Sequence, residues 1–129
     1  MREIRFRAWD KKRNEMVYFD FQLLHDESSS FYNEQIKDNP LMQFTGLKDK
    51  YGREIYEGDI IQGNLFDRRL PTMGTVVYDR EYACFGNENE AGITFLFKIA
   101  DIEVIGNIWE NQKLLNGGSE GRQEKATNQ

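Results

Sequence analysis

GLKDKYGREIYEGDII, residues 46–61, is the stretch in which turn and strand chemistry follow one another most clearly. Asp49 and Gly52 hold the first and fourth positions of a predicted type I turn, with Gly52 in the left-handed backbone region that only Gly adopts without steric cost. Residues 54–56 then form a short predicted strand. Residues 57–59 bend the chain into the Ile pair at 60–61, which suits a buried barrel strand. The stretch therefore predicts a β-hairpin followed by a bend.

This hairpin belongs to the first of three segments that together resemble one protein family. The segments are LMQFTGLKDKYGREIYEGDII (41–61), IRFRAWDKKRNEMVY (4–18) and IEVIGNIWENQKLL (102–115). In their order along the chain they resemble the YopX family of phage and prophage proteins. The chain departs from the family pattern at Tyr51, where the family turn more often has Asn, and at Gln112, where it more often has Pro. The resemblance implies an SH3-like small β-barrel in the carboxy-terminal half behind an amino-terminal β segment, and it implies no activity for any residue.

A chain of 129 residues suits one domain, or a small barrel with an extension. We expect a mainly β fold with an amino-terminal hairpin and linker at 1–45 and an SH3-like barrel at 46–115. The remaining segment, 116–129, contains no large apolar residue and is predicted to be a disordered tail.

The net charge of -5 argues against a general duplex-binding protein, which needs a basic footprint to release counterions from DNA. This net charge is still compatible with a local basic patch. The single Cys, Cys84, excludes an intramolecular disulfide. Neither a signal peptide nor a membrane span is apparent. The expected location is the cytoplasm, which for a phage family is the cytoplasm of the bacterial host.

The first segment of the chain predicts a β-hairpin over residues 3–19. Residues 4, 6 and 8 alternate with Arg5, Arg7 and Trp9, the period of a half-buried strand. Residues 1–13 hold six Lys or Arg against two acids. One interpretation is a patch in which Arg5, Arg7 and Trp9 bind phosphate or an acidic partner by charge and stacking. The other, which we favour because charge runs are usually solvated, pairs the arginines across the hairpin with acids such as Glu15.

The segment 21–40 is compatible with a broken helix or an ordered loop, and a short helix is expected between Ser30 and Lys37. Its lone His25 has neither a second His nor a Cys nearby, which gives a metal site little support. A solvent-facing or capping role suits His25 better.

The second half predicts short strands at 75–78, 82–85, 93–99 and 102–105, as in a small barrel. Residues 62–74 contain two Gly, a Pro and the Arg68-Arg69 pair, and predict a long exposed loop. Residues 86–90 predict a polar connection. At the end of this half, Asn107 and Glu110 have the spacing of a capping box before one or two helical turns at 109–115.

Catalytic motifs are scarce in this sequence, and we expect a protein that is not an enzyme and has no cofactor. No phosphate-binding G-x-x-x-x-G-K-[ST] motif occurs. Cys84 and His25 lack a positioned third group, and we expect Cys84 to be an apolar strand residue. Asp101 and Glu103 fall on one face of a strand, where surface solvation explains them better than a metal or catalytic site.

Two functional hypotheses follow. The leading one is a non-enzymatic interaction module that self-associates or binds a protein partner, with a homo-oligomer whose interface includes the hairpin. Its basis is the opposite charge of the basic hairpin and of residues 81–110, which carry six acids and one base. The alternative is a single-strand nucleic-acid accessory protein of phage replication or regulation. Its candidate contacts are Arg5, Arg7, Trp9, Arg68 and Arg69.

Overall fold

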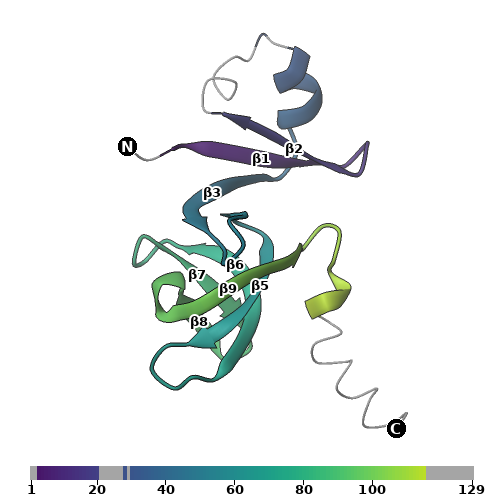
Figure 1. Cartoon of the computed structure of the whole chain (residues 1–129). Helices are drawn as coiled ribbons and strands as arrows, with labels where there is room; N and C mark the ends of the chain where they lie inside the picture. Colours follow the sequence, from purple (N-terminus) through teal and green to yellow (C-terminus); the bar gives the residue numbers. More distant parts are fainter. Residues whose placement is uncertain (1–2, 21–27, 29, 116–129) are drawn as a thin grey trace, which may run out of the picture.

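The computed structural model describes residues 3–20, 28 and 30–115, and it shows a mainly β protein built from two sheets (Figure 1). The four-stranded sheet has the order β2-β1-β3-β4, and the five-stranded sheet has the order β8-β7-β6-β5-β9. Its strands are β1 (Arg5–Asp10), β2 (Glu15–Asp20), β3 (Leu41–Lys48), β4 (Glu54–Tyr56), β5 (Asp59–Leu65), β6 (Pro71–Asp79), β7 (Cys84–Asn89), β8 (Gly92–Phe95) and β9 (Ile99–Asn107). Two short helical turns, η1 (Tyr32–Ile36) and η2 (Leu96–Lys98), complete the described elements.

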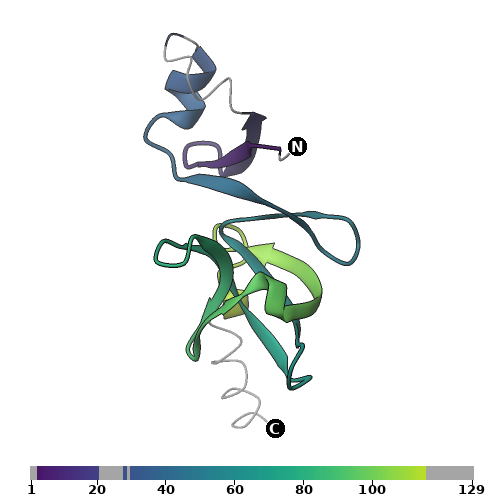
Figure 2. The same cartoon turned by 90° about the vertical axis from the view of Figure 1, so that its left-hand side faces the viewer.

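The predicted hairpin and bend at 46–61 are both present. The Gly52 N–H donates to the Asp49 carbonyl at 2.9 Å, and Gly52 has a φ of 82°, as the turn requires. Gly58 follows β4 with a φ of 86° and turns the chain into β5. Strand β3 runs through the boundary expected between residues 45 and 46 and pairs with β1 and β4, and the chain passes to the second sheet at the bend between β4 and β5 (Figures 1 and 2).

The fold has two apolar clusters. The larger one lies at the five-stranded sheet and contains Ile61, Val76, Leu96, Ile99 and Ile102 together with Ile55, which β4 of the four-stranded sheet contributes. The smaller cluster packs Ala8 and Phe19 of the first hairpin against Ile36 of η1. Because each buried side chain of this size stabilises the fold by about 1.5–3 kcal/mol, both clusters contribute to its stability.

Two loop predictions in the second half are wrong. Strands β5 and β6 form a long hairpin in which Gly63 pairs with Thr72 and Asn64 with Pro71, so that the expected loop 62–74 shrinks to residues 66–70. Residues 86–89 belong to β7 and do not form a connection. The cause is tertiary packing, since a Cβ at Gly63 would lie 2.6 Å from Ile99 and one at Gly86 would lie 2.6 Å from Ile93.

The first hairpin is present, but the face of its first strand that carries Arg7 and Trp9 is not exposed to solvent. Arg7 and Trp9 on this face of β1 are buried, as are Ala8 and Asp10 on the opposite face. The half-buried strand expected from alternation is therefore buried on both sides over its last four residues. Predictions for His25 and the tail 116–129 lie outside the described residues.

Candidate functional site

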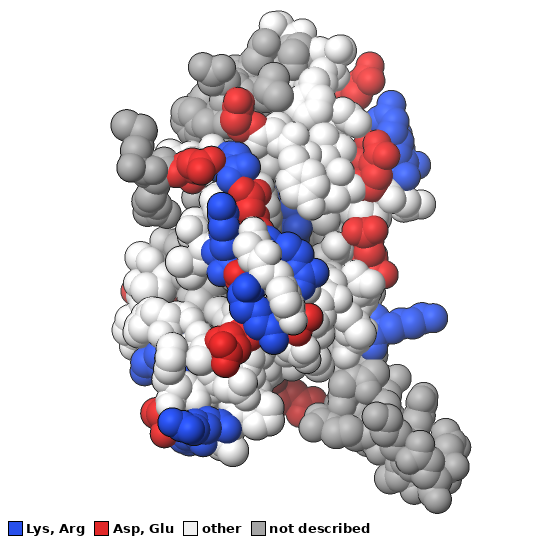
Figure 3. Space-filling view, in the orientation of Figure 1, with Lys and Arg blue, Asp and Glu red and all other residues white. Residues whose placement is uncertain are grey.

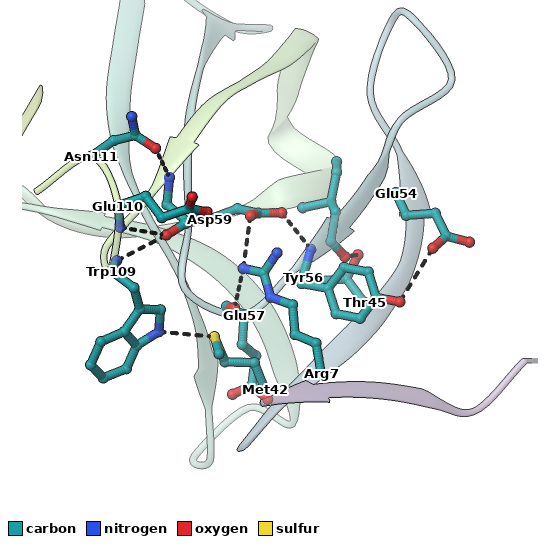
Figure 4. A network of polar contacts seen from close by, with 12 residues as sticks. Arg7, Met42, Thr45, Glu54, Tyr56, Glu57, Asp59, Trp109, Glu110 and Asn111 are labelled. Carbon is teal, nitrogen blue, oxygen red and sulfur yellow. Dashed lines mark hydrogen bonds and ion pairs between the residues drawn. The ribbon is translucent and has the colours of Figure 1, made fainter. Parts of the chain in front are cut away.

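The two sheets meet through a buried ion pair (Figure 4). Arg7 of β1 lies 2.8 Å from a carboxylate oxygen of Asp59 at the start of β5, and each side chain is 4% exposed. Arg7 also donates to the Glu57 carbonyl at 3.0 Å, and Asp59 accepts the Tyr56 N–H at 2.7 Å. Burial raises the pKa of the Asp59 carboxyl, although the charge of Arg7 opposes this shift. Arg7 thus fixes the first hairpin on the bend at Gly58.

A second, more exposed pair lies beside the first. Arg5 pairs with Glu3 of its own segment and with Glu54 of β4, and its guanidinium lies 4.9 Å above the centre of the Phe44 ring. The Tyr56 hydroxyl donates to the other Glu54 oxygen at 3.2 Å. Arg5 and Glu54 side chains are 34% and 27% exposed, so this pair is accessible to solvent.

Two tryptophans join the sheets at the other end of β1. The Trp9 and Trp109 rings stack with centroids 6.2 Å apart, and Trp109 donates from Nε1 to the Met42 sulfur at 3.3 Å. Asn107 holds the turn in place, because its Oδ1 accepts from the Trp109 and Glu110 backbone N–H groups, both at 2.9 Å. Its Nδ2 donates to the Glu110 carboxylate. The predicted cap bonds to the Asn107 side chain are confirmed, but the Asn107 N–H donates to the Asn111 Oδ1 at 3.1 Å and not to Glu110 as in a capping box.

A groove of about 760 Å³ opens between the sheets beside these contacts, and we call it the junction groove. Its volume falls within the range of ligand-binding pockets. The groove combines guanidinium, phenol and carboxylate groups with an apolar wall from β9. Its lining residues are Arg5, Arg7, Arg53, Tyr18, Tyr56, Glu54, Asp59, Phe19 and residues 104–107.

The tip of the β3–β4 hairpin supports that β9 wall. The buried Asp49 carboxylate accepts the backbone N–H groups of Tyr51, Arg53 and Val104 at 2.9, 2.9 and 3.0 Å. Burial alone raises the pKa of Asp49, but these N–H donors and Arg53 outweigh it and lower the pKa overall. The Lys50 N–H donates to Ile102 at 2.8 Å. Asp49 therefore both closes the turn and attaches it to β9.

The same tip carries an exposed aromatic ring between two cations. Tyr51 is 66% exposed, with Lys50 and Arg53 centred 5.2 and 5.5 Å from its ring. Figure 3 shows basic side chains gathered in the middle of this face, over the β3–β4 turn of Figure 1.

The five candidate residues from the sequence do not form one surface. Arg5 and the buried Arg7 line the junction groove, whereas Trp9 is buried away from it. Arg68 and Arg69 lie in the 66–70 loop of the five-stranded sheet, away from the first hairpin (Figure 1). There Arg68 lines a small hollow of about 200 Å³ with Lys98 and residues 93–95.

The acids that pair with the two arginines were also not the expected ones. Arg5 and Arg7 pair with Glu54 and Asp59, about fifty residues away, and not with Glu15 across the hairpin. Arg53, Tyr56 and Asp59 were missed as site residues because their roles depend on long-range contacts. In the sequence, only the turn-forming residues around them indicated that this segment is structurally important.

The remaining chemical candidates stay apart. Within the described ranges, no group of three or more His, Cys, Asp and Glu side chains is arranged to hold a metal ion. Cys84 begins β7 and is partly buried. Glu103 pairs with Lys50 and accepts from Gln62, while Asp101 is exposed. Among the described helices, none has the length and apolar character needed to cross a bilayer.

Comparisons with known proteins agree with this architecture. The chain is similar over 89% of its length to the crystal structure of protein EF1440 from Enterococcus faecalis, of which it covers 99%, with 25% identity and a TM-score of 0.50. It is also similar to the crystal structure of protein yopX from Bacillus subtilis, with 20% identity, coverage of 86% and 97%, and a TM-score of 0.49. No curated protein sequence matches. The family model described as YopX protein matches residues 5–116, and the chain therefore belongs to the YopX family.

Proposed function

We propose that this protein is a non-enzymatic interaction module that holds an extended segment of a protein partner in the junction groove. The observation that carries the proposal is the groove itself, a hollow of about 760 Å³ between two sheets. Its lining is rich in Arg and Tyr, the side chains that most often dominate the energy of protein interfaces. These groups combine apolar area with fixed donors, which suits a peptide better than a reacting substrate.

The fold supports a binding role of this kind. The second sheet curls around its apolar cluster, which supports its assignment to the SH3-like small barrels (Figure 2). Strand β9 is an outer strand of that sheet in the described order, and its residues 104–107 form the groove wall. The Val104 N–H and the Ile102 carbonyl of this strand are already bonded to Asp49 and Lys50, so the wall offers a peptide apolar side chains and not a free strand edge. Phage origin and a bacterial cytoplasmic location stay predictions of the sequence.

Selection from a displayed library of random dodecapeptides tests the proposal directly. The selected peptides should bind the purified protein and lose about tenfold or more in affinity when Tyr18→Ala removes a groove ring. Phe97→Ala is the matched control, because Phe97 is an equally exposed ring on η2 that does not line the groove. Peptides that bind both variants equally, or a library that yields no binder, would contradict the proposal.

A second candidate function has one specific observation in its favour. The Tyr51 ring lies exposed between Lys50 and Arg53, an arrangement on which a base stacks while cations contact phosphate. Binding of oligothymidine that weakens steeply with salt and is lost in Tyr51→Ala would support a single-strand nucleic-acid role. Oligothymidine binding that is unaffected both by salt and by Tyr51→Ala would exclude this site.

A further inference from the structure

We infer that the five-stranded sheet carries a separate binding surface for single-stranded nucleic acid, on which bases stack against a row of exposed rings. We call this surface the aromatic face, and it consists of Tyr82, Phe95, Phe97, Arg68 and Lys98. None of these described residues lines the junction groove. The inference shares its ligand class with the second candidate function, but it depends neither on Tyr51 nor on a peptide in the groove.

The first step is that three rings from consecutive elements form a row. Tyr82, in the turn after β6, meets Phe95 of β8 edge to face, with ring centroids 5.6 Å apart. Phe95 in turn stacks on Phe97 of η2 at 5.7 Å, with the two planes 21° apart. Tyr82 and Phe97 are nevertheless 64% and 66% exposed. Phe97 therefore has one face on Phe95 and its other face open, so that a planar base can extend the stack.

The second step is that the fold holds these rings in place. Gly86 of β7 pairs with Phe95, and a Cβ at Gly86 would lie 2.6 Å from Ile93 and 3.6 Å from the Phe95 ring. Leu96, between the two phenylalanines, is buried in the larger apolar cluster and anchors η2. The three rings themselves belong to neither of the two described clusters. Because the core fixes the rings without burying them, binding to them costs little side-chain freedom.

The third step is that cations beside the row are not neutralised. Arg68 and Lys98 line the small hollow of about 200 Å³ together with Phe95, and Asp67 is the acid among the lining residues. The Arg68–Asp67 contact is long, at 3.8 Å, and both side chains are at least 70% exposed. Within the described ranges, neither Lys98 nor the adjacent exposed Arg69 forms an ion pair. A phosphate group in the hollow would supply the missing negative charge.

The fourth step separates a single strand from other anionic partners. A single strand offers unpaired bases for the open ring faces and phosphates for the cations. A duplex keeps its bases stacked on one another, and it also requires a broad basic footprint that a protein of net charge -5 does not offer. An anionic membrane would attract the same cations, but lipid chains do not continue a stack of rings. Single-stranded nucleic acid is the ligand class that uses both features of the aromatic face.

The test measures fluorescence anisotropy of a labelled oligothymidine and of an abasic strand with the same length and backbone. The unmodified protein should bind oligothymidine about fivefold or more tightly than the abasic strand, because the rings contribute only when bases are present. Phe97→Ala should weaken oligothymidine binding about fivefold or more and remove most of this preference. Lys98→Gln should weaken both strands and lower the slope of the logarithm of affinity against the logarithm of salt concentration by about 0.7.

Two variants serve as matched controls. Tyr51→Ala removes an equally exposed ring at the tip of the β3–β4 hairpin, and Lys12→Gln removes one exposed positive charge at the turn of the first hairpin. Both should bind oligothymidine as the unmodified protein does. Circular dichroism of each variant confirms that the comparison is made between folded proteins.

The contrary outcomes are distinct. Oligothymidine binding that is lost in Tyr51→Ala and kept in Phe97→Ala would place the nucleic acid on the hairpin tip and overturn the inference. Equal affinity for the abasic strand, or no binding of either strand, would overturn it as well. If vesicles of phosphatidylserine and phosphatidylcholine bind instead, and Phe97→Ala weakens that binding, the aromatic face belongs to a membrane surface. The peptide selection described above tests the junction groove separately, so that failure of one proposal leaves the other standing.

Discussion

Single residues at the junction differ in what surrounds them, and two glycines show this clearly. Gly52 and Gly58 both have positive φ, at 82° and 86°. A Cβ at Gly52 meets nothing within 4 Å, whereas one at Gly58 would lie 2.8 Å from the Met42 sulfur and 3.7 Å from Arg7. Gly52→Ala should cost about 1 kcal/mol of unfolding free energy, and Gly58→Ala about 2–4 kcal/mol, because crowding adds to the backbone strain. Urea unfolding curves measure both, and equal costs would show that Met42 moves aside freely.

Two buried carboxylates should give opposite pH dependence. The pKa of Asp49 is lowered in the folded protein by its N–H donors against the effect of burial, so its contribution is present above the unfolded pKa of about 4 and is lost as pH falls through the folded pKa. The destabilisation caused by Asp49→Asn, about 1–3 kcal/mol at pH 7, should therefore shrink on acidification.

Asp59 has the reverse sign. Burial raises its pKa, so its contribution is present below about pH 4 and declines as pH rises through the folded pKa. The cost of Asp59→Asn should be larger in acid than at pH 7. Thermal melts of both variants from pH 3 to 7 measure how the cost of each substitution changes with pH. Two costs that change in the same direction would contradict these assignments.

At the scale of elements, the turn from β9 to residues 108–110 fastens the two sheets through an aromatic stack. Trp9 and Trp109 are the only tryptophans of the chain, and their rings lie 9° from parallel. Trp109→Phe should abolish the tryptophan pair signal in near-ultraviolet circular dichroism and cost about 0.5–1.5 kcal/mol. The far-ultraviolet spectrum serves as the control and should not change. A retained near-ultraviolet couplet would show that the signal arises elsewhere.

Local patterns predicted the elements whose formation depends on local chemistry. The turn at Asp49–Gly52, the bend at Gly58 and the cap at Asn107 all follow from residue types at fixed spacing, and all are present. The β5–β6 hairpin was missed because Gly63 and Thr72 look like loop residues until the close approach of Ile99 is known. Whether a polar, Gly-containing segment forms a strand depends on the strand with which it pairs. A local sequence pattern does not contain that information.

The candidate site was predicted less well than the fold for the same physical reason. Arg5 and Arg7 were recognised as notable, but their partners Glu54 and Asp59 lie about fifty positions away. Charge alternation in β1 indicated a solvated face, and the second sheet covers that face. The junction groove exists only once the two sheets are docked.

On the scale of the whole molecule, the Arg7–Asp59 pair determines how firmly the sheets are joined. Arg7→Met leaves Asp59 buried without its partner and should cost about 3–5 kcal/mol. Arg7→Met combined with Asp59→Asn removes both charges and keeps an acceptor for Tyr56, so the double variant should recover part of that loss. Urea unfolding in a double-mutant cycle measures the coupling. Additive costs would show that the pair contributes nothing beyond its two separate side chains.

Self-association remains a proposal, but the structure changes its basis. The arginines expected to attract a second copy pair within the chain, so charge steering by Arg5 and Arg7 no longer supports it. The remaining support is β2, an outer strand of the described four-stranded sheet with no Pro and with Tyr18 58% exposed. We predict an oligomer in which the β2 edges of two copies pair, and Met16→Pro should break it by removing a backbone donor from that edge, because the Met16 N–H points away from β1.

Sedimentation equilibrium at high micromolar concentration gives the mass of both forms. The unmodified protein should exceed the monomer mass of 15.2 kDa, and Met16→Pro should approach it. Because a Pro in β2 also restricts the backbone that pairs with β1, Tyr18→Arg is a second variant that places charge on an exposed side chain of the same strand and leaves the backbone unchanged. If assembly occurs through β2, both variants should weaken it. High salt should restore part of the assembly of Tyr18→Arg alone, because salt screens the repulsion between the added charges of the two copies. A monomeric mass for the unmodified protein would contradict self-association and leave the junction groove with a heterologous partner.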